Sequence, residues 1–401
     1  MRNSKSSRRK AEQSRARKEL LFVLPVVIAL TFWAGLRFTE PVTRVAMMSA
    51  SLALSQGTVK TIQDNLQEAT TVEAETEPTE EETTQPAPTE AVQAVSAKLS
   101  DTPQDILDMM EAEKAKYDTG EKAGNVVEKQ YGKDNATNVY QNVTVRNTTS
   151  SHSVDIKTSL KKKATLQITD KTKPTVLIFH THTTECYELL NMGWYTKSYL
   201  TRINDKSKNM VRVGDAICEQ LEKAGIGYIH DTEIHDAKYT GAYDRSRETI
   251  TKIMAENPTI QVVIDVHRDA IMQSDGTRIK PTAEIDGKKA AQIMIIAGCE
   301  DGKVTNFPRW EENLTFALQL QQTAETKYPG LMRPILFSAR KYNMDVTPCS
   351  VLLEMGSDSN TLEEAVYSGR LIGTALAELL EKYITLSLIH ISEPTRLDVI
   401  S

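Results

Sequence analysis

Short apolar runs alternate with helical patterns after Pro174. The pattern predicts strands at 175–179, 227–230, 261–266, 291–298, 334–338 and 350–355, and helices at 213–224, 246–255, 313–327 and 362–383. This alternation is typical of crossover units, so we expect an α/β fold with a mostly parallel sheet and helices on both faces. The runs VLIF, VVIDV and SVLLEM are apolar at successive positions, as in strands buried on both sides. Asn360 stands three residues before Glu363, which predicts a capping box at the last helix.

The pattern upstream is less regular. Residues 106–117 carry apolar side chains at helical spacing, and residues 143–168 alternate like short strands interrupted by turn residues. We therefore predict a small subdomain of one helix and several strands over 101–170. The main α/β domain is predicted to cover 171–385.

The N-terminal part has the pattern of a membrane anchor. Residues 20–36 form an uncharged run of 17 residues, at the short end of what spans a bilayer as a helix. Residues 1–19 hold eight basic and two acidic side chains, and the positive-inside rule places this end in the cytoplasm. We therefore expect a single-pass protein of the cell membrane whose chain after Arg37 is extracytoplasmic. A cleaved signal peptide is the alternative, with small residues at 46–53 available for its cleavage site.

Composition distinguishes the remaining segments. Residues 37–100 are predicted to form a stalk, and its acidic part at 68–90, with eight glutamates and no basic residue, is predicted to be disordered. Residues 386–401 contain LSLIHISEPTR, which resembles a translated sequencing adapter, so this tail is predicted not to be native. A net charge of −6 of uneven distribution excludes a uniformly basic nucleic-acid binder. Four cysteines in 401 residues exclude a disulfide scaffold and are interpreted as buried thiols.

Three of the predicted strands run into polar residues. The strand at 175–179 leads into HTHTTE, the strand at 261–266 leads into His267, and the strand that begins at Ser350 leads into Glu354. In open parallel sheets, ligands bind outside the carboxyl ends of the strands. If these strands are parallel, their polar residues converge on one edge of the sheet.

The residue types at these strand ends indicate a metal. His182 and Glu185 have the H-x-x-E spacing, and His267 supplies a third ligand from another strand. Two histidines, one carboxylate and an open position for water form the usual catalytic zinc site. His180 lies on the same side of the extended run as His182, so either one could be the ligand and the other a hydrogen-bonding neighbour.

Other polar residues have supporting interpretations. Asp265 is placed to orient the neighbouring histidine, and Arg268 is placed to hold a substrate carboxylate. His230, Asp231 and His235 form an H-D-x-x-x-H cluster, for which a loop near the cleft or a plain surface is favoured over a second metal site.

Taken together, these motifs resemble those of a known family. The anchor, the stalk, the segment with the H-D-x-x-x-H and YDRS motifs, and the segments LIFHTHTTE, IDVHRDA and LLEMGSDSNTLEEA resemble the stage II sporulation protein P family over about residues 140–385. That family is similar to zinc-dependent N-acetylmuramoyl-L-alanine amidases, so the resemblance implies an amidase-like fold and a Zn2+-dependent hydrolase. It implies a membrane-anchored enzyme that removes stem peptides from peptidoglycan during engulfment in sporulation. It also implies partnership with the stage II sporulation proteins D and M.

The resemblance also assigns roles by position. It implies zinc on His182, on a glutamate and on His267, and a catalytic carboxylate on Glu354. The related amidases have their glutamate much further from the first histidine than Glu185 is. Other candidates for the glutamate are Glu188 and Glu233.

Two other functions compete with the amidase. A zinc peptidase that cleaves stem-peptide crosslinks is the first alternative, because H-x-x-E followed by a distant histidine also occurs in carboxypeptidases. A non-enzymatic wall-binding module with a degenerate site is the second. The presence of all the zinc-type residues and a spare carboxylate argues against the second.

Overall fold

The computed structural model describes residues 98–385. The helices are α4 (Gln104–Thr119), η1 (Lys133–Asn135, a 3-10 helix), α5 (Ile156–Ser159), α6 (Met210–Lys223), α7 (Ala242–Glu256), α8 (Trp310–Lys327) and α9 (Leu362–Glu381). The strands are β1 (Lys122–Lys129), β2 (Asn138–Tyr140), β3 (Val143–Asn147), β4 (Val176–Phe179), β5 (Trp194–Thr196), β6 (Tyr228–His230), β7 (Val262–Asp269), β8 (Arg278–Ile285), β9 (Lys288–Ala291), β10 (Ile293–Gly298), β11 (Ile335–Ser338) and β12 (Cys349–Ser357).

Several predictions concern segments outside this range. The anchor at 20–36, the acidic stretch at 68–90 and the tail at 386–401 lie outside the described residues. Within 98–385, no helix is both long and apolar enough to cross a membrane. The anchor therefore stays a prediction from the sequence.

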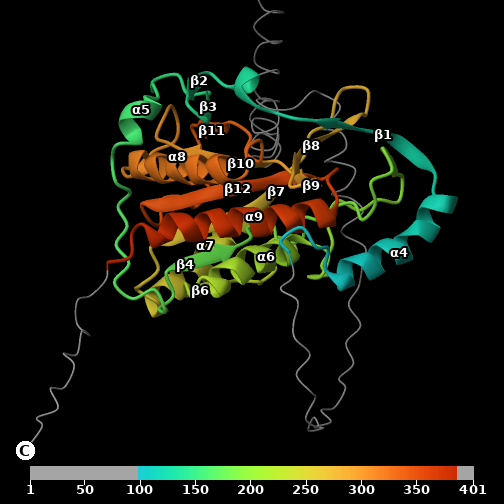
Figure 1. Ribbon diagram of the computed structural model, residues 1–401, viewed down its shortest axis with the longest axis horizontal. Helices are drawn as coiled ribbons and strands as arrows, with labels where there is room; N and C mark the ends of the chain where they lie inside the picture. The colour runs from blue at the N-terminus through green and yellow to red at the C-terminus, as the bar shows by residue number, and fades with distance from the viewer. Residues whose placement is uncertain (1–97, 386–401) are drawn as a thin grey trace, which may run out of the picture. The chain divides into compact units, whose positions relative to one another are not determined.

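The main sheet has eight strands in the order β2-β3-β11-β10-β12-β7-β4-β6 (Figure 1). Five of its seven neighbouring pairs are parallel, and only β2–β3 and β10–β12 are antiparallel. The six strands predicted after Pro174 all belong to this sheet. The prediction of an α/β fold with a mostly parallel sheet is confirmed.

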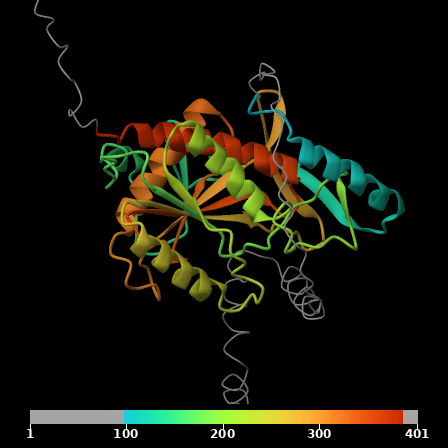
Figure 2. The same cartoon turned by 90° about the horizontal axis from the view of Figure 1, so that it is seen from below.

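Helices cover both faces of this sheet (Figure 2). Leu177 and Phe179 of β4 pack with Ile250 of α7 on one face. Val176 and Ile178 point to the other face and join the large core formed with α6, α8 and α9. Successive side chains of a strand point to opposite faces, so an entirely apolar β4 can be buried between two helical layers.

A second sheet, in the order β5-β1-β8-β9, lies outside the prediction. β1 belongs to this sheet, whereas β2 and β3 extend the main sheet, so the strands of region 101–170 do not form a sheet of their own. The expected strand around Ile156 is wrong, because this residue begins the short helix α5. β8 escaped prediction because its Lys280 is fully buried, with its Nζ 2.8 Å from Glu364 Oε1.

The capping box of α9 is shifted by one residue from the prediction. Thr361 Oγ1 accepts from the Glu364 amide at 3.2 Å, and the Glu364 carboxylate accepts from the Thr361 amide at 3.1 Å. The side chain of Asn360 instead accepts from the amide of Ser357 and fixes the turn that leads out of β12. The adjacent Asn-Thr pair offers two N-cap side chains, and tertiary contacts select the threonine.

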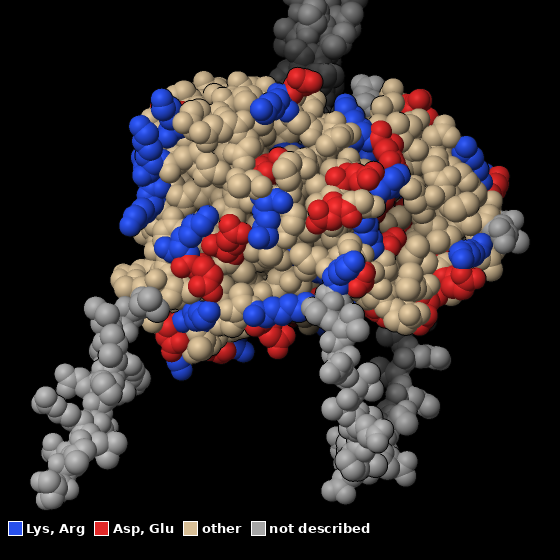
Figure 3. All heavy atoms as spheres, in the orientation of Figure 1, with Lys and Arg blue, Asp and Glu red and all other residues tan. Residues whose placement is uncertain are grey.

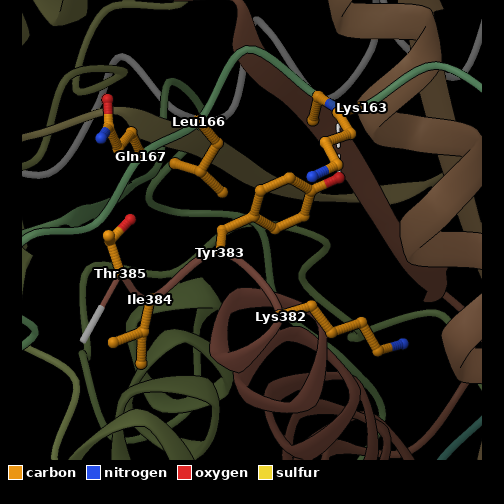
Figure 4. Close-up of a pocket in the computed structure, with 8 residues that line it drawn as sticks. Lys163, Leu166, Gln167, Lys382, Tyr383, Ile384 and Thr385 are labelled. Atoms are coloured by element: carbon orange, nitrogen blue, oxygen red, sulfur yellow. Dashed lines mark hydrogen bonds between the residues drawn. The ribbon is translucent and has the colours of Figure 1, made fainter.

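The surface does not show a uniform charge. On the face seen in Figure 3, basic and acidic side chains are interspersed. A surface pocket of about 260 Å³ lies between the segment 163–167 and the end of α9 (Figure 4). Its charged lining residues are Lys163 and Lys382, and it has neither a carboxylate nor an imidazole for metal chemistry. The candidate chemistry lies instead at the strand ends.

Candidate active site

The strands β12, β7 and β4 are adjacent and parallel. Phe179 at the end of β4 pairs with Asp265 of β7, and His267 of β7 pairs with Glu354 of β12. The carboxyl ends of these strands therefore meet at one edge of the sheet, as the sequence predicts. The loop after β4 brings His182 to the same edge.

The three predicted metal ligands lie near one another at this edge. Glu185 Oε2 is 3.7 Å from His267 Nδ1. The ring of His182 stands edge-to-face to that of His267, with 5.3 Å between the ring centroids. All three side chains are buried. Two imidazoles and one carboxylate are thus assembled in a site largely closed to solvent.

The residues present fit a zinc ion. His182 Nδ1 is buried and has no hydrogen-bond partner, and the same is true of Glu354 Oε2. Buried polar atoms without partners are uncommon in folded proteins, and a missing ion or water is one physical explanation. The donor set of two histidines and one carboxylate is that of catalytic zinc sites.

A second group of ligand-type residues lies nearby. Among residues 98–385, Asp231, Glu233 and His235 are the one set of three whose possible ligand atoms all lie within 4.8 Å of one another. This set is more compact than the predicted one, but His235 Nε2 already lies 2.8 Å from Asp231 Oδ2. Glu233 is exposed and accepts from the Thr249 hydroxyl. Because the His235 ring is already paired with Asp231 and the Glu233 carboxylate is exposed, this set is the weaker metal candidate.

His180 is held in a different way from His182. Its Nδ1 donates to the Val266 carbonyl at 2.9 Å, and its Nε2 is 2.9 Å from His230 Nε2. Both ring nitrogens are occupied, and burial lowers the pKa of His180 well below its usual value. A side chain at Gly214 of α6 would come within 2.7 Å of the ring, so only glycine fits there. This geometry favours His182 over His180 as the ligand.

Asp265 and Arg268 flank His267 and make different contacts. Asp265 Oδ1 lies 2.8 Å from His267 Nε2, at an angle unsuited to a hydrogen bond, and its carboxylate accepts from Thr181. Although burial opposes the charged form, Asp265 and Glu185 raise the pKa of His267 to about 9. Arg268 donates to the backbone carbonyls of Cys186 and Thr201. Its guanidinium therefore holds the loop beside the site and is not free for a substrate carboxylate.

Glu354 lies beside the predicted ligands, on the strand next to His267. Burial, together with the nearby carboxylate of Asp269, raises the pKa of Glu354, while His267 and Arg333 act in the opposite direction. A carboxylate that gains protons readily and has one unpartnered oxygen is suited to proton transfer.

Four further side chains complete the site. Arg202 and Asp236 contact the loop that follows β4, and Arg202 donates to both Asp236 and Glu185. Tyr239 stacks on His182 with 4.8 Å between ring centroids, and Tyr243 contacts the same ring edge-to-face. Sequence reasoning did not assign them a role. None of the four directly follows a predicted strand. Only Asp236 and Tyr243 lie next to or in a motif, since Asp236 follows His235 and Tyr243 begins YDRS.

Glu188, an alternative glutamate ligand, is engaged elsewhere. Its Oε2 accepts from the Tyr117 hydroxyl of α4 at 2.6 Å, and it is buried. Burial raises the pKa of Glu188 from 4.5 to about 7. This contact ties α4 to the segment that follows the site, which is a structural role.

This burial leads to a prediction about stability. Glu188→Gln is expected to increase the free energy of unfolding by up to about 3 kcal/mol at pH 8 and to change it little near pH 4. Below the unfolded pKa the carboxyl is protonated in both states, so its burial costs little. As the pH rises from about 4.5 to 7, ionisation is easier in the unfolded chain, and the wild type loses stability.

Denaturant unfolding of both proteins at pH 4, 6 and 8 tests this expectation. Glu111→Gln, which replaces an exposed carboxylate on the same helix that carries Tyr117, is the control and should show no such pH-dependent difference. Parallel pH profiles for wild type and Glu188→Gln would contradict the interpretation.

With the geometry described, comparison with known proteins decides the family. The family model described as Stage II sporulation protein P matches residues 67–377. The chain belongs to this family. The resemblance predicted from the sequence motifs is confirmed, and the match extends further towards the N-terminus than those motifs.

A curated relative and several solved structures are also similar. The Stage II sporulation protein P of Bacillus subtilis (strain 168) is 35% identical over 204 residues, covering 48% of this chain and 47% of that protein. The chain thus spans about half the length of this curated relative.

Among solved structures, the N-acetylmuramoyl-L-alanine amidase AmiC2 of Nostoc punctiforme has a TM-score of 0.32 and 12% identity, covering 54% of this chain and 98% of that one. The CwlD amidase of Clostridioides difficile, in complex with the GerS lipoprotein, has a TM-score of 0.32 and 15% identity, covering 52% and 98%. Sequence identities and TM-scores this low support no conclusion about the activity of this chain.

Proposed function

We propose that this protein is a zinc-dependent peptidoglycan hydrolase of the N-acetylmuramoyl-L-alanine amidase type. One observation carries the proposal: His182, Glu185, His267 and Glu354 meet at the carboxyl edge of adjacent parallel strands. Membership of the Stage II sporulation protein P family supports a role in sporulation.

In this proposal His182, Glu185 and His267 hold the metal. When bound, zinc supplies a Lewis acid that polarises a carbonyl oxygen and lowers the pKa of water. The Asp265 carboxylate, whose Oδ1 lies 2.8 Å from His267 Nε2, places a negative charge beside the ring nitrogen that does not face Glu185. The ring of Tyr239 covers one face of His182 and shields that side of the site from solvent.

Glu354 is the general base and acid of the proposed reaction. Its carboxylate takes a proton from the attacking water and gives it to the leaving nitrogen of the stem peptide. The bond that breaks is the amide between the lactyl group of muramic acid and L-alanine. Burial raises the pKa of Glu354 to about 8, with Arg333 and His267 limiting the rise, so this carboxyl can both take up and release a proton near neutral pH.

The location and partners are also part of the proposal. The uncharged run at 20–36 anchors the chain in the cell membrane, and the acidic stalk extends the catalytic domain towards the wall. The sequence resemblance supports the stage II sporulation proteins D and M as partners. The same resemblance supports engulfment as the stage at which the enzyme acts.

Product analysis tests the proposed activity. The purified full chain, loaded with zinc, is incubated with isolated peptidoglycan, and the soluble products are identified by mass spectrometry. We expect free stem peptides and peptide-free glycan strands. If crosslinks are cut while the stems stay on the glycan, the protein is a zinc endopeptidase, and if no bond is cut, the wall-binding alternative replaces the enzyme.

A further inference from the structure

A single arginine connects the loops around the candidate metal site. Arg202 Nη2 donates to Glu185 Oε1 at 3.1 Å, and its Nη1 donates to Asp236 Oδ2. Asp236 Oδ2 lies 3.7 Å from His182 Nδ1. One guanidinium therefore contacts one predicted ligand directly and a second one through a carboxylate.

The two carboxylates that Arg202 joins are deeply buried. The side chain of Asp236 is fully buried and that of Glu185 is 7% exposed, whereas that of Arg202 is 35% exposed. Asp236 also accepts from the amide and the hydroxyl of Thr184, which lies between His182 and Glu185 in the sequence. Two buried carboxylates on either side of one guanidinium would repel each other without it, and Arg202 supplies the compensating positive charge.

The backbone on both sides of Arg202 is fixed. Arg202 forms an antiparallel bridge with Glu185, and the amide of Ile203 donates to the Thr184 carbonyl at 2.7 Å. Arg268 donates to the carbonyls of Thr201 and Cys186 and so clamps the two segments that form the bridge. These contacts hold the backbone of Arg202 against the loop that carries Glu185.

The contacts leave the two oxygens of Glu185 with different surroundings. Oε1 is taken by Arg202, while Oε2 faces His267 Nδ1 at 3.7 Å and accepts from the Arg268 amide. A carboxylate held this way presents one chosen oxygen to the metal position. Partners that hydrogen-bond to metal-binding carboxylates commonly change metal affinity by about 10- to 100-fold when they are removed.

We propose that Arg202 is a positioning residue, which orients the Glu185 carboxylate for zinc and compensates the charge of Asp236 beside His182. This inference rests on the proposed zinc site. It assigns to Arg202 a role that acts through the carboxylates of Glu185 and Asp236.

Zinc affinity is the measurement that tests this role. The full chain is stripped of metal, and its affinity for zinc alone is measured by competition with a chromophoric chelator. We expect Arg202→Gln to weaken zinc binding by about 10- to 100-fold, and Arg202→Lys to lose less, because a lysine keeps the charge but cannot hold both carboxylates at once.

The control variant is Arg247→Gln. Arg247 is similarly exposed, at 39% of its side chain, and pairs with Asp345 by two contacts away from the predicted ligands. Its loss should leave zinc affinity unchanged. Circular dichroism of the metal-stripped proteins checks that each variant is folded, and Arg202→Lys provides the comparison if Arg202→Gln is not.

The outcomes separate this inference from the proposed function. If Arg202→Gln binds zinc as tightly as wild type, or loses no more affinity than Arg247→Gln, the positioning role is wrong while the zinc site stands. If wild type binds no zinc, the proposed function fails, and the role of Arg202 fails with it.

Discussion

Replacing either His182 or His267 with alanine should abolish zinc binding and lower peptidoglycan cleavage by roughly a thousandfold, since the metal contributes several kcal/mol to the reaction barrier. Each change removes one of two imidazoles from a site with only three protein ligands. The sheet core lies below the strand ends, so most of the fold should persist. Metal analysis of the purified proteins gives the zinc content, and circular dichroism reports the fold.

Two further variants make this prediction specific. Glu233→Gln changes the exposed member of the Asp231, Glu233 and His235 group and should keep both zinc and activity. His180→Ala should keep zinc even if it lowers stability, because both nitrogens of His180 bond to the protein. Zinc lost with Glu233→Gln or His180→Ala, but kept with His182→Ala, would move the metal to another set of ligands.

The sequence predicts the main sheet well because its central strands are apolar on both sides. A run such as Val176–Phe179 has one physical solution in an α/β protein, which is burial between helical layers. The same rule fails for β8, where Lys280 is buried against Glu364 and Arg278 lies beneath the rings of Tyr195 and Tyr199. Burial of these cations depends on partners far along the chain, and no local pattern reveals it.

The residues of the candidate site also fall into those that the sequence predicts and those that it does not. His182, His267 and Glu354 can be found from the sequence because each lies near the carboxyl end of a recognisable strand, and parallel strands bring these ends together. Arg202 and Asp236 reach the site from loops, where no period constrains their position. The role suggested for Arg268 changes for a related reason, because the backbone carbonyls that its guanidinium binds become apparent only in the folded chain.

Glu354→Gln provides the second large expected effect. The change keeps the shape of the side chain and removes its ability to accept a proton, so turnover should fall by about a hundredfold or more. Zinc content should stay at the wild-type level, since Glu354 is not among the three proposed ligands. The substitution also removes a buried carboxyl whose pKa is raised by burial, so the variant should be no less stable near neutral pH.

Three measurements on each purified protein separate an effect on catalysis from an effect on stability. Turnover of isolated peptidoglycan is compared with zinc content and with the midpoint of thermal unfolding, for Glu354→Gln and for Glu284→Gln. Glu284 is exposed on β8, so its variant controls for the loss of one negative charge and should match wild type in all three. If Glu354 only bridged neighbouring strands, its Gln variant would keep near-normal turnover and lose stability, and that result would exclude it as the general base. Loss of turnover with zinc and stability retained is the pattern expected of a proton carrier beside the metal.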